Sequence, residues 1–130
     1  MGYAYHDGAN WQIETVYSTG IVCDFISLAL DSGGNPHISY NDSASTGLGY
    51  AYHDGANWQV EIADISGSVG FVGIHNSLAL DSGGNPHISY YDMANENLKY
   101  AVRRLSGGGG GDGSSGGCFI STVAYRFRMQ

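Results

Sequence analysis

The chain has 130 residues, 42% of them hydrophobic, and a formal net charge of −7. This composition predicts one folded domain rather than a disordered chain, and no run of 18 apolar residues could span a membrane as a helix. All five basic residues lie in 99–130 and eleven of the twelve acidic residues lie in 1–98. An acidic body without clustered lysine or arginine argues against nucleic acid as a partner.

Two exact repeats organise the chain. The segment GYAYHDGANWQ fills 2–12 and 49–59, and the segment SLALDSGGNPHISY fills 27–40 and 77–90. The copies are therefore offset by 47 and 50 residues. Repeats of this length are typical of propeller blades and other stacked arrays, in which each unit buries its faces on its neighbours.

Alternation of side chains with a period of two predicts nine strands in the body of the chain. In chain order they read GYAYHDG, WQIETVY, FISLALD, PHISYND, LGYAYHDG, WQVEIAD, SLALD, PHISYYD and LKYAVRR. The DGAN and DSGGN segments between them supply the Gly, Asn and Asp residues that hairpin turns require. Asp31 and Asp81 head two of these turns, where a carboxylate can accept backbone N–H bonds.

The two sides of these strands differ in size. One side carries Tyr, Leu and Ile, and the other carries Ala, Ser and an occasional His. A sheet open to water would instead show Lys, Glu or Thr on its wet side. Large and small sides suit stacking, because the bulky side of one sheet can settle on the flat side of the next.

The expected fold is all-β, with two tandem four-stranded antiparallel propeller-like blades plus one extra strand. The two-blade domain spans 1–105, with repeat 1 at about 2–48, repeat 2 at about 49–98 and the extra strand at 98–104. A Gly/Ser-rich linker follows at 106–117 and a strand-like tail at 118–130. The tail is predicted to be a strand because large and small side chains alternate along it.

Two segments resemble known families. SLALDSGGNPHISYYD followed by LKYA resembles the blades of bacterial β-propeller repeats that are loosely related to the sialidase-type Asp-box families. This resemblance covers 2–104, and two blades are too few to close a ring of the usual size. The tail sequence CFISTVAYR resembles a module centred on CFIATAAYGS in bacterial exported proteins, with matches at Cys118, Phe119 and Ile120.

The second resemblance implies an extracellular or cell-surface location in a bacterium. No basic start and apolar stretch follow Met1, so no signal peptide is visible. We therefore expect export by another route or an N-terminus that has been processed. A third possibility is that the chain is the last two blades of a longer propeller.

No catalytic, metal or cofactor site is predicted. Four of the five histidines recur with the repeat, as structural residues do, and His75 stands alone. The sialidases that the repeat resembles need an arginine cluster, which 1–102 does not contain. Cys23 and Cys118 lack metal-ligand spacing and are either a disulfide pair or two unrelated thiols. Asp92 lies beside Asn95 and other oxygen donors, but the spacing fits no EF-hand, and a solvated loop is expected there.

The first functional hypothesis is a non-enzymatic structural protein that assembles with copies of itself. Uncovered blade faces and edges need neighbours, and head-to-tail contacts give a ring or an open fibre. The tethered tail strand can add to a sheet edge within or between chains, and the basic end of one chain can meet the acidic body of another. The predicted contact residues are Tyr3, Tyr5, Tyr100, Arg103, Arg104, Phe119, Val123, Tyr125 and Phe127.

The second hypothesis is a carbohydrate-binding propeller. In this case three chains of two blades would close a six-bladed ring. Trp11 and Trp58 follow the two DGAN turns and would offer flat faces to a glycan.

Overall fold

The computed structural model describes residues 1–17, 23–65, 72–104 and 119–125, and these residues form an all-β structure without helices. Accordingly, no helix in the described ranges could cross a membrane. The nine predicted body strands and the tail strand are all present. They are β1 (Gly2–His6), β2 (Trp11–Thr15), β3 (Cys23–Leu30), β4 (Pro36–Asp42), β5 (Gly47–His53), β6 (Trp58–Ile65), β7 (Val72–Leu80), β8 (Pro86–Asp92), β9 (Asn97–Arg104) and β10 (Phe119–Tyr125).

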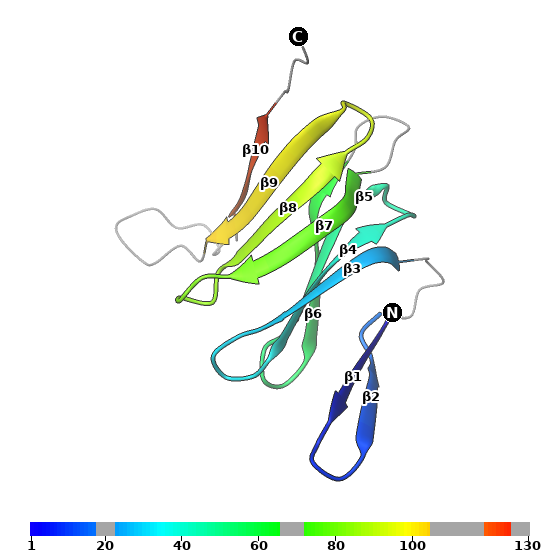
Figure 1. The fold of residues 1–130 in the computed structure, drawn as a ribbon, viewed down its shortest axis with the longest axis vertical. Coiled ribbons are helices and arrows are strands. Elements are labelled where there is room, and N and C mark those ends of the chain that lie inside the picture. The colour runs from blue at the N-terminus through cyan, green and yellow to red at the C-terminus, as the bar shows by residue number, and fades with distance from the viewer. Residues whose placement is uncertain (18–22, 66–71, 105–118, 126–130) are drawn as a thin grey trace, which may run out of the picture.

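The strands form three antiparallel sheets (Figure 1). β1 and β2 make a separate hairpin, β3-β4-β5-β6 make the first four-stranded sheet, and β10-β9-β8-β7 make the second. The expected arrangement of two four-stranded blades from the N-terminus with one strand left over therefore differs from the structure. The surplus lies at the N-terminus as a hairpin, and the tail strand completes the second sheet. The sequence could not set this grouping, because β1 and β5 share the same residues GYAYH.

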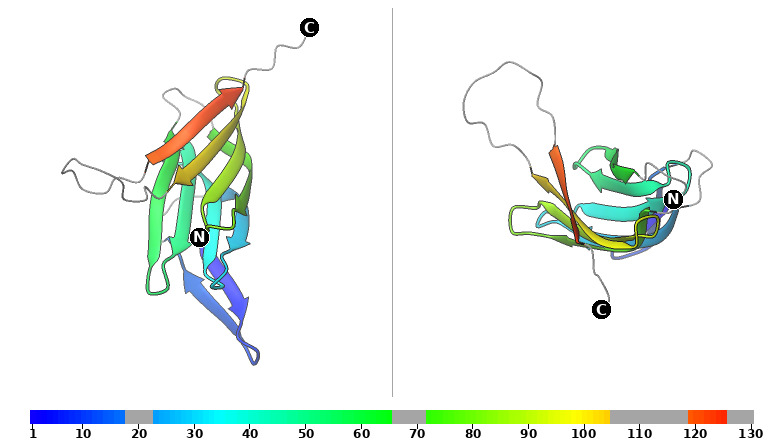
Figure 2. Two further views of the ribbon diagram at one scale, coloured as in Figure 1. Left: turned by 90° about the vertical axis from the view of Figure 1, so that its left-hand side faces the viewer. Right: turned by 90° about the horizontal axis from the view of Figure 1, so that it is seen from above.

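The two four-stranded sheets stack face to face, with β7 against β3 and β4 (Figure 2). One core cluster lies between them and is built from Leu48 and Tyr50 of the first sheet with residues such as Leu78, Ile88 and Tyr90 of the second. A second cluster lies between the hairpin and the first sheet. The stack is open, since the described sheets do not close into a ring.

The predicted division into a large and a small face holds along single strands but not across a sheet. Tyr50 of β5 lies opposite Ser39 of β4, and Ala51 lies opposite Ile38. Residues directly opposite one another in a ladder share a face. The tyrosines of β5 therefore lie on the same face as the small residues of β4, so each face of the sheet carries both large and small side chains.

Candidate functional site

The face of the first sheet that points towards the hairpin is only partly covered. Leu28 of β3 is 51% exposed, whereas the repeat-related Leu78 of β7 is 8% exposed because it packs on the first sheet. Leu30 is exposed to a similar extent. The hairpin covers the neighbouring residues Ile38 and Tyr40 but leaves β3 open. We call Leu28 and Leu30 the head face.

The opposite end of the stack shows a matching uncovered surface on the second sheet. Leu98 of β9 is 47% exposed, whereas its repeat counterpart Leu48 is 0% exposed beneath the second sheet. Ser89 is exposed and lies on the same face as Leu98, because Ser89 pairs with Tyr100 and Leu98 with Tyr91. We call Leu98, Ser89 and Ala79 the tail face. It is the repeat-related copy of the surface that receives Leu78 inside the chain.

The hairpin is held against the first sheet by polar and aromatic contacts. The indole N–H of Trp58 donates to Glu14 at 2.9 Å, and its ring meets Tyr3 edge to face at 5.6 Å between centroids. Tyr3 in turn stacks on Tyr5. Trp58, predicted as a glycan platform, therefore packs between the hairpin and the sheet. Trp11 is 69% exposed and touches His6 at the hairpin end.

Strand β9 is fastened to the first sheet by ion pairs. The Lys99 ammonium lies 2.9 Å from a carboxylate oxygen of Asp64 on β6 and 3.0 Å from one of Asp92. Arg103 lies 2.9 Å from Glu61 of β6 and donates to the Tyr52 hydroxyl at 3.1 Å. Two basic residues at the C-terminal end thus meet the acidic body of their own chain.

Asp92 does not lie in a solvated loop, as the sequence suggested, but is buried. Burial opposes its ionisation, yet hydrogen bonds from Asn95 and Lys99 outweigh it and lower the pKa of the carboxyl group below its usual value. Partial burial would lower the pKa of Lys99, but the carboxylates of Asp64 and Asp92 outweigh it and raise this pKa above its usual value. The basic residue seven positions after Asp92 was the available signal for this pairing.

The tail strand β10 pairs antiparallel with β9, at the position that β6 occupies beside β5 in the first sheet. Of the predicted contact residues on these strands, Tyr100 is half-buried and its hydroxyl bonds to His87. For Phe119, Val123 and Tyr125 the structure defines the backbone partners, which are Arg104, Tyr100 and Leu98. Phe127 and Cys118 lie outside the described residues, so the Cys23–Cys118 disulfide stays a prediction.

The repeated turns take the predicted form. The Asp31 carboxylate accepts the backbone N–H groups of Gly33 and Asn35, each at 2.8 Å. Hydrogen bonds led by the Asn35 side chain lower the pKa of Asp31 to about 2. His37 lies beside this turn, and its Nδ1 is 2.5 Å from the Tyr50 hydroxyl.

Sequence reasoning missed the histidine–tyrosine contact, which recurs as His87 with Tyr100. The signal was present, because each histidine is followed by its tyrosine after 13 residues in both repeats. Burial also lowers the pKa of His37, so its imidazole is neutral near pH 7.

No protein-family model, curated protein or solved structure matches the chain. Among the described residues, no group of three or more His, Cys, Asp or Glu side chains could hold a metal ion. The described residues present two partly uncovered sheet faces, the head face and the tail face, and two seams between packed sheets.

Proposed function

We propose that this protein is a non-enzymatic structural protein that assembles head to tail with copies of itself. The observation that carries the proposal is the contrast between Leu28 and Leu78, which occupy the same place in the repeat with 51% and 8% of their surface exposed. A sheet covers the buried Leu78. Covering the exposed Leu28 in the same way would remove its apolar surface from water, which is favourable. A second copy can supply the covering sheet.

The tail face provides the complementary surface. Inside the chain, the face that carries Leu78 packs on the face that carries Leu48 and Tyr50. The head face is the repeat-related copy of the face that carries Leu78, and the tail face is the copy of the face that carries Leu48. The tail face of one molecule can therefore pack on the head face of the next. Covering a half-exposed leucine contributes on the order of 1 kcal/mol, and each contact covers such residues on both partners.

A contact between two different faces can propagate, because each added molecule presents a new free face. It closes into a ring when the rotation between neighbours permits and otherwise grows as a fibre. The terminal hairpin favours the fibre. Its strand β1 is a copy of β5 and resembles β9. In a simple closed ring, β1 of one chain and β9 of its neighbour would compete for the same place beside the neighbour's β8.

The tail strand gives the assembly a second connection. The ladder between β10 and β9 uses the unpaired edge of a three-stranded sheet, which is the usual acceptor for an added strand. The preceding segment 106–117 is rich in Gly and Ser, a composition typical of flexible tethers. The same ladder can therefore form within a chain or between neighbouring chains.

The proposal is tested by electron microscopy and analytical ultracentrifugation of the full chain over a range of concentrations. We expect long uniform fibres, and we expect Leu28→Ser to shorten or abolish them. Met93→Ser is the matched control, since Met93 is 50% exposed, like Leu28, but lies in the turn between β8 and β9 and is not a residue of the head face. A 13.8 kDa monomer at every concentration, or fibres unchanged by Leu28→Ser, would overturn the proposal.

A further inference from the structure

A pocket of about 280 Å³ lies at the seam between the two four-stranded sheets. The first sheet contributes Tyr52 and His53 from the end of β5 and His37 from β4, while the second contributes Pro86 and Arg103. Its lining includes residues of the β3–β4, β5–β6 and β7–β8 turns, which lie at the same end of the two sheets (Figure 1). This volume is just below the usual range for small-molecule sites, about 300–1,000 Å³, and suits a ligand of one ring.

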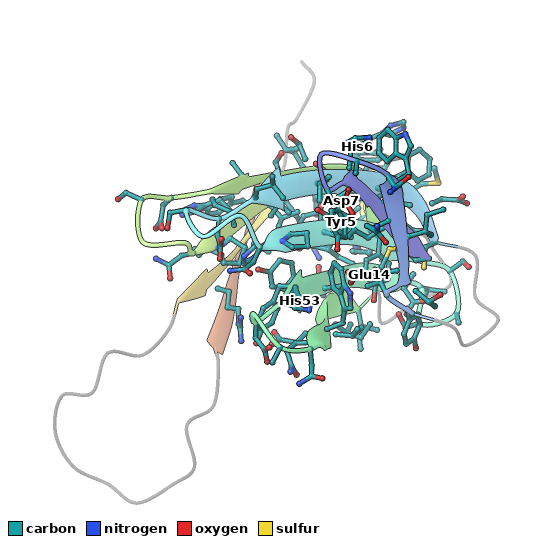
Figure 3. All side chains as sticks on the ribbon, turned by 90° about the horizontal axis from the view of Figure 1, so that it is seen from below. Tyr5, His6, Asp7, Glu14 and His53 are labelled. Carbon is teal, nitrogen blue, oxygen red and sulfur yellow. The ribbon has the colours of Figure 1, made fainter. Side chains whose placement is uncertain are left out.

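A second pocket of about 200 Å³ lies at the seam between the hairpin and the first sheet. Figure 3 looks onto this end of the molecule and labels Tyr5, Glu14 and His53, which line it. Its lining repeats that of the larger pocket, with Tyr3 for Tyr50, Tyr5 for Tyr52, Gly34 for Gly84, Pro36 for Pro86 and His53 for Arg103. In both pockets the paired tyrosine rings lie 5.6 Å apart at 24°. Stacking of consecutive sheets therefore builds a pocket at each seam.

The larger pocket has one group that the smaller pocket lacks. Asp31 and Asn35 come from the β3–β4 turn and His37 from the start of β4, and the hairpin has no counterparts of β3 and β4 to supply these groups. Among the described residues, the buried His37 Nε2 has no hydrogen-bond partner, and the nearest carboxylate oxygen, on Asp31, is 3.7 Å away. A buried polar atom of this kind at a pocket wall is suited to bind a ligand oxygen.

The lining combines aromatic rings with several polar groups. The rings of Tyr52, His37 and His53 line it, and hydrogen-bonding side chains such as Asn35 lie among them. This mixture matches a ligand that has an apolar face and several hydroxyl groups. Carboxylates outnumber the single basic group Arg103, which is already paired with Glu61, so an anionic ligand would be repelled.

We propose that the seam pocket between the two four-stranded sheets binds one residue of a neutral saccharide, at one site per chain. His37 and Tyr52 supply hydrogen bonds to its hydroxyl groups, and the aromatic lining contacts its C–H face. The smaller pocket at the hairpin is the weaker site because it lacks the Asp–Asn–His turn. This activity is separate from self-assembly, since every residue of the pocket comes from one chain.

The probes are methyl glycosides of glucose, mannose, galactose and fucose together with N-acetylglucosamine, tested at millimolar concentration by saturation-transfer NMR and calorimetry. We expect at least one to bind with a stoichiometry of one per chain. Measurement on both the natural chain and Leu28→Ser separates this result from assembly, because saccharide binding should be the same in both. Absence of binding by every neutral sugar would overturn the proposal, as would tighter binding of glucuronic or N-acetylneuraminic acid.

The repeat supplies a matched pair of variants for the location of the site. His37→Phe and His87→Phe each remove a histidine–tyrosine hydrogen bond, but only His37 lines the pocket. His37→Phe should weaken binding about tenfold and His87→Phe less than about twofold. Tyr52→Phe against Tyr100→Phe repeats the comparison with smaller changes, in case His37→Phe does not fold, because Tyr52 lines the pocket and Tyr100 lines neither pocket. Equal effects within both pairs would place the site elsewhere.

Discussion

At the scale of single residues, the core contains a tyrosine, Tyr40, whose ring fits only because the residue beneath it, Gly49, has no side chain. Tyr40 is fully buried, and its ring lies over Gly49, the residue directly opposite it on β5. A Cβ atom at Gly49 would overlap this ring. The second sheet places Lys99 opposite Tyr90 at the equivalent position, so the two sheets solve the same packing problem with different residues.

Gly49→Ala should destabilise the protein by about 2 kcal/mol, because a methyl group forced into a filled core displaces its neighbours. Gly2→Ala is the matched control, since Gly2 holds the same place in the repeat but its added Cβ would meet only the Glu14 carbonyl oxygen at 3.6 Å. The measurement is urea unfolding of both variants. Equal stabilities would mean that Tyr40 does not lie over Gly49 as described.

At the scale of elements, β9 differs from its repeat counterpart β5 in its charges. Lys99 replaces the small Gly49 and reaches Asp64 of the neighbouring sheet, and Tyr90 also donates to Asp64 at 2.7 Å. Arg103 lies 4.6 Å from the centre of the Tyr52 ring, as well as pairing with Glu61. These contacts fix β9 and therefore fix the edge on which β10 forms its ladder.

Lys99→Met should lower the free energy of unfolding by about 3 kcal/mol, because it leaves the buried Asp92 carboxylate without its cation. The double variant Lys99→Met with Asp92→Asn should recover part of this loss, since the remaining amide carries no charge. Denaturant unfolding of the two single variants and the double variant gives the coupling energy. Additive effects would show that the ion pair contributes nothing.

At the scale of the whole molecule, the two uncovered surfaces are different from one another. The head face presents leucines of β3, and the tail face presents Leu98 among small residues of the second sheet. A contact between two unlike faces leaves one free face on each added molecule, whereas a symmetric dimer uses the same face twice and stops. Blocking either face stops growth, and two chains blocked on opposite faces can still join once.

Leu28→Asp and Leu98→Asp should each be monomeric, because a charge on either face prevents the contact with its mate. An equimolar mixture should form a 1:1 heterodimer, since the second protein keeps its head face and the first keeps its tail face. Sedimentation velocity of the separate proteins and of the mixture distinguishes the species. Dimers of Leu98→Asp alone would instead indicate head-to-head association, and a mixture that stays monomeric would contradict both arrangements.

The sequence by itself determined the strands, the turns and the packing of consecutive repeat units on one another. Residues that alternate with a period of two, such as Leu28, Ala29 and Leu30, predicted strands because successive side chains point to opposite faces. The turn role of Asp31 followed from the chemistry of its neighbours within a few residues. The duplicated segments indicated that consecutive units cover one another, as Leu78 does on the first sheet.

Only the tertiary structure decided which strands join and what lies at their seams. β1 and β5 share the residues GYAYH, yet among the described strands β1 pairs with β2 alone while β5 lies between β4 and β6, because β4 pairs with β3 and β5 and so leaves the hairpin outside the sheet. The register that sets Tyr50 beside Ser39 is likewise a property of two strands. The seam pocket and the pairing of Lys99 with Asp64 need two sheets in contact, so their geometry depends on packing that no single segment encodes.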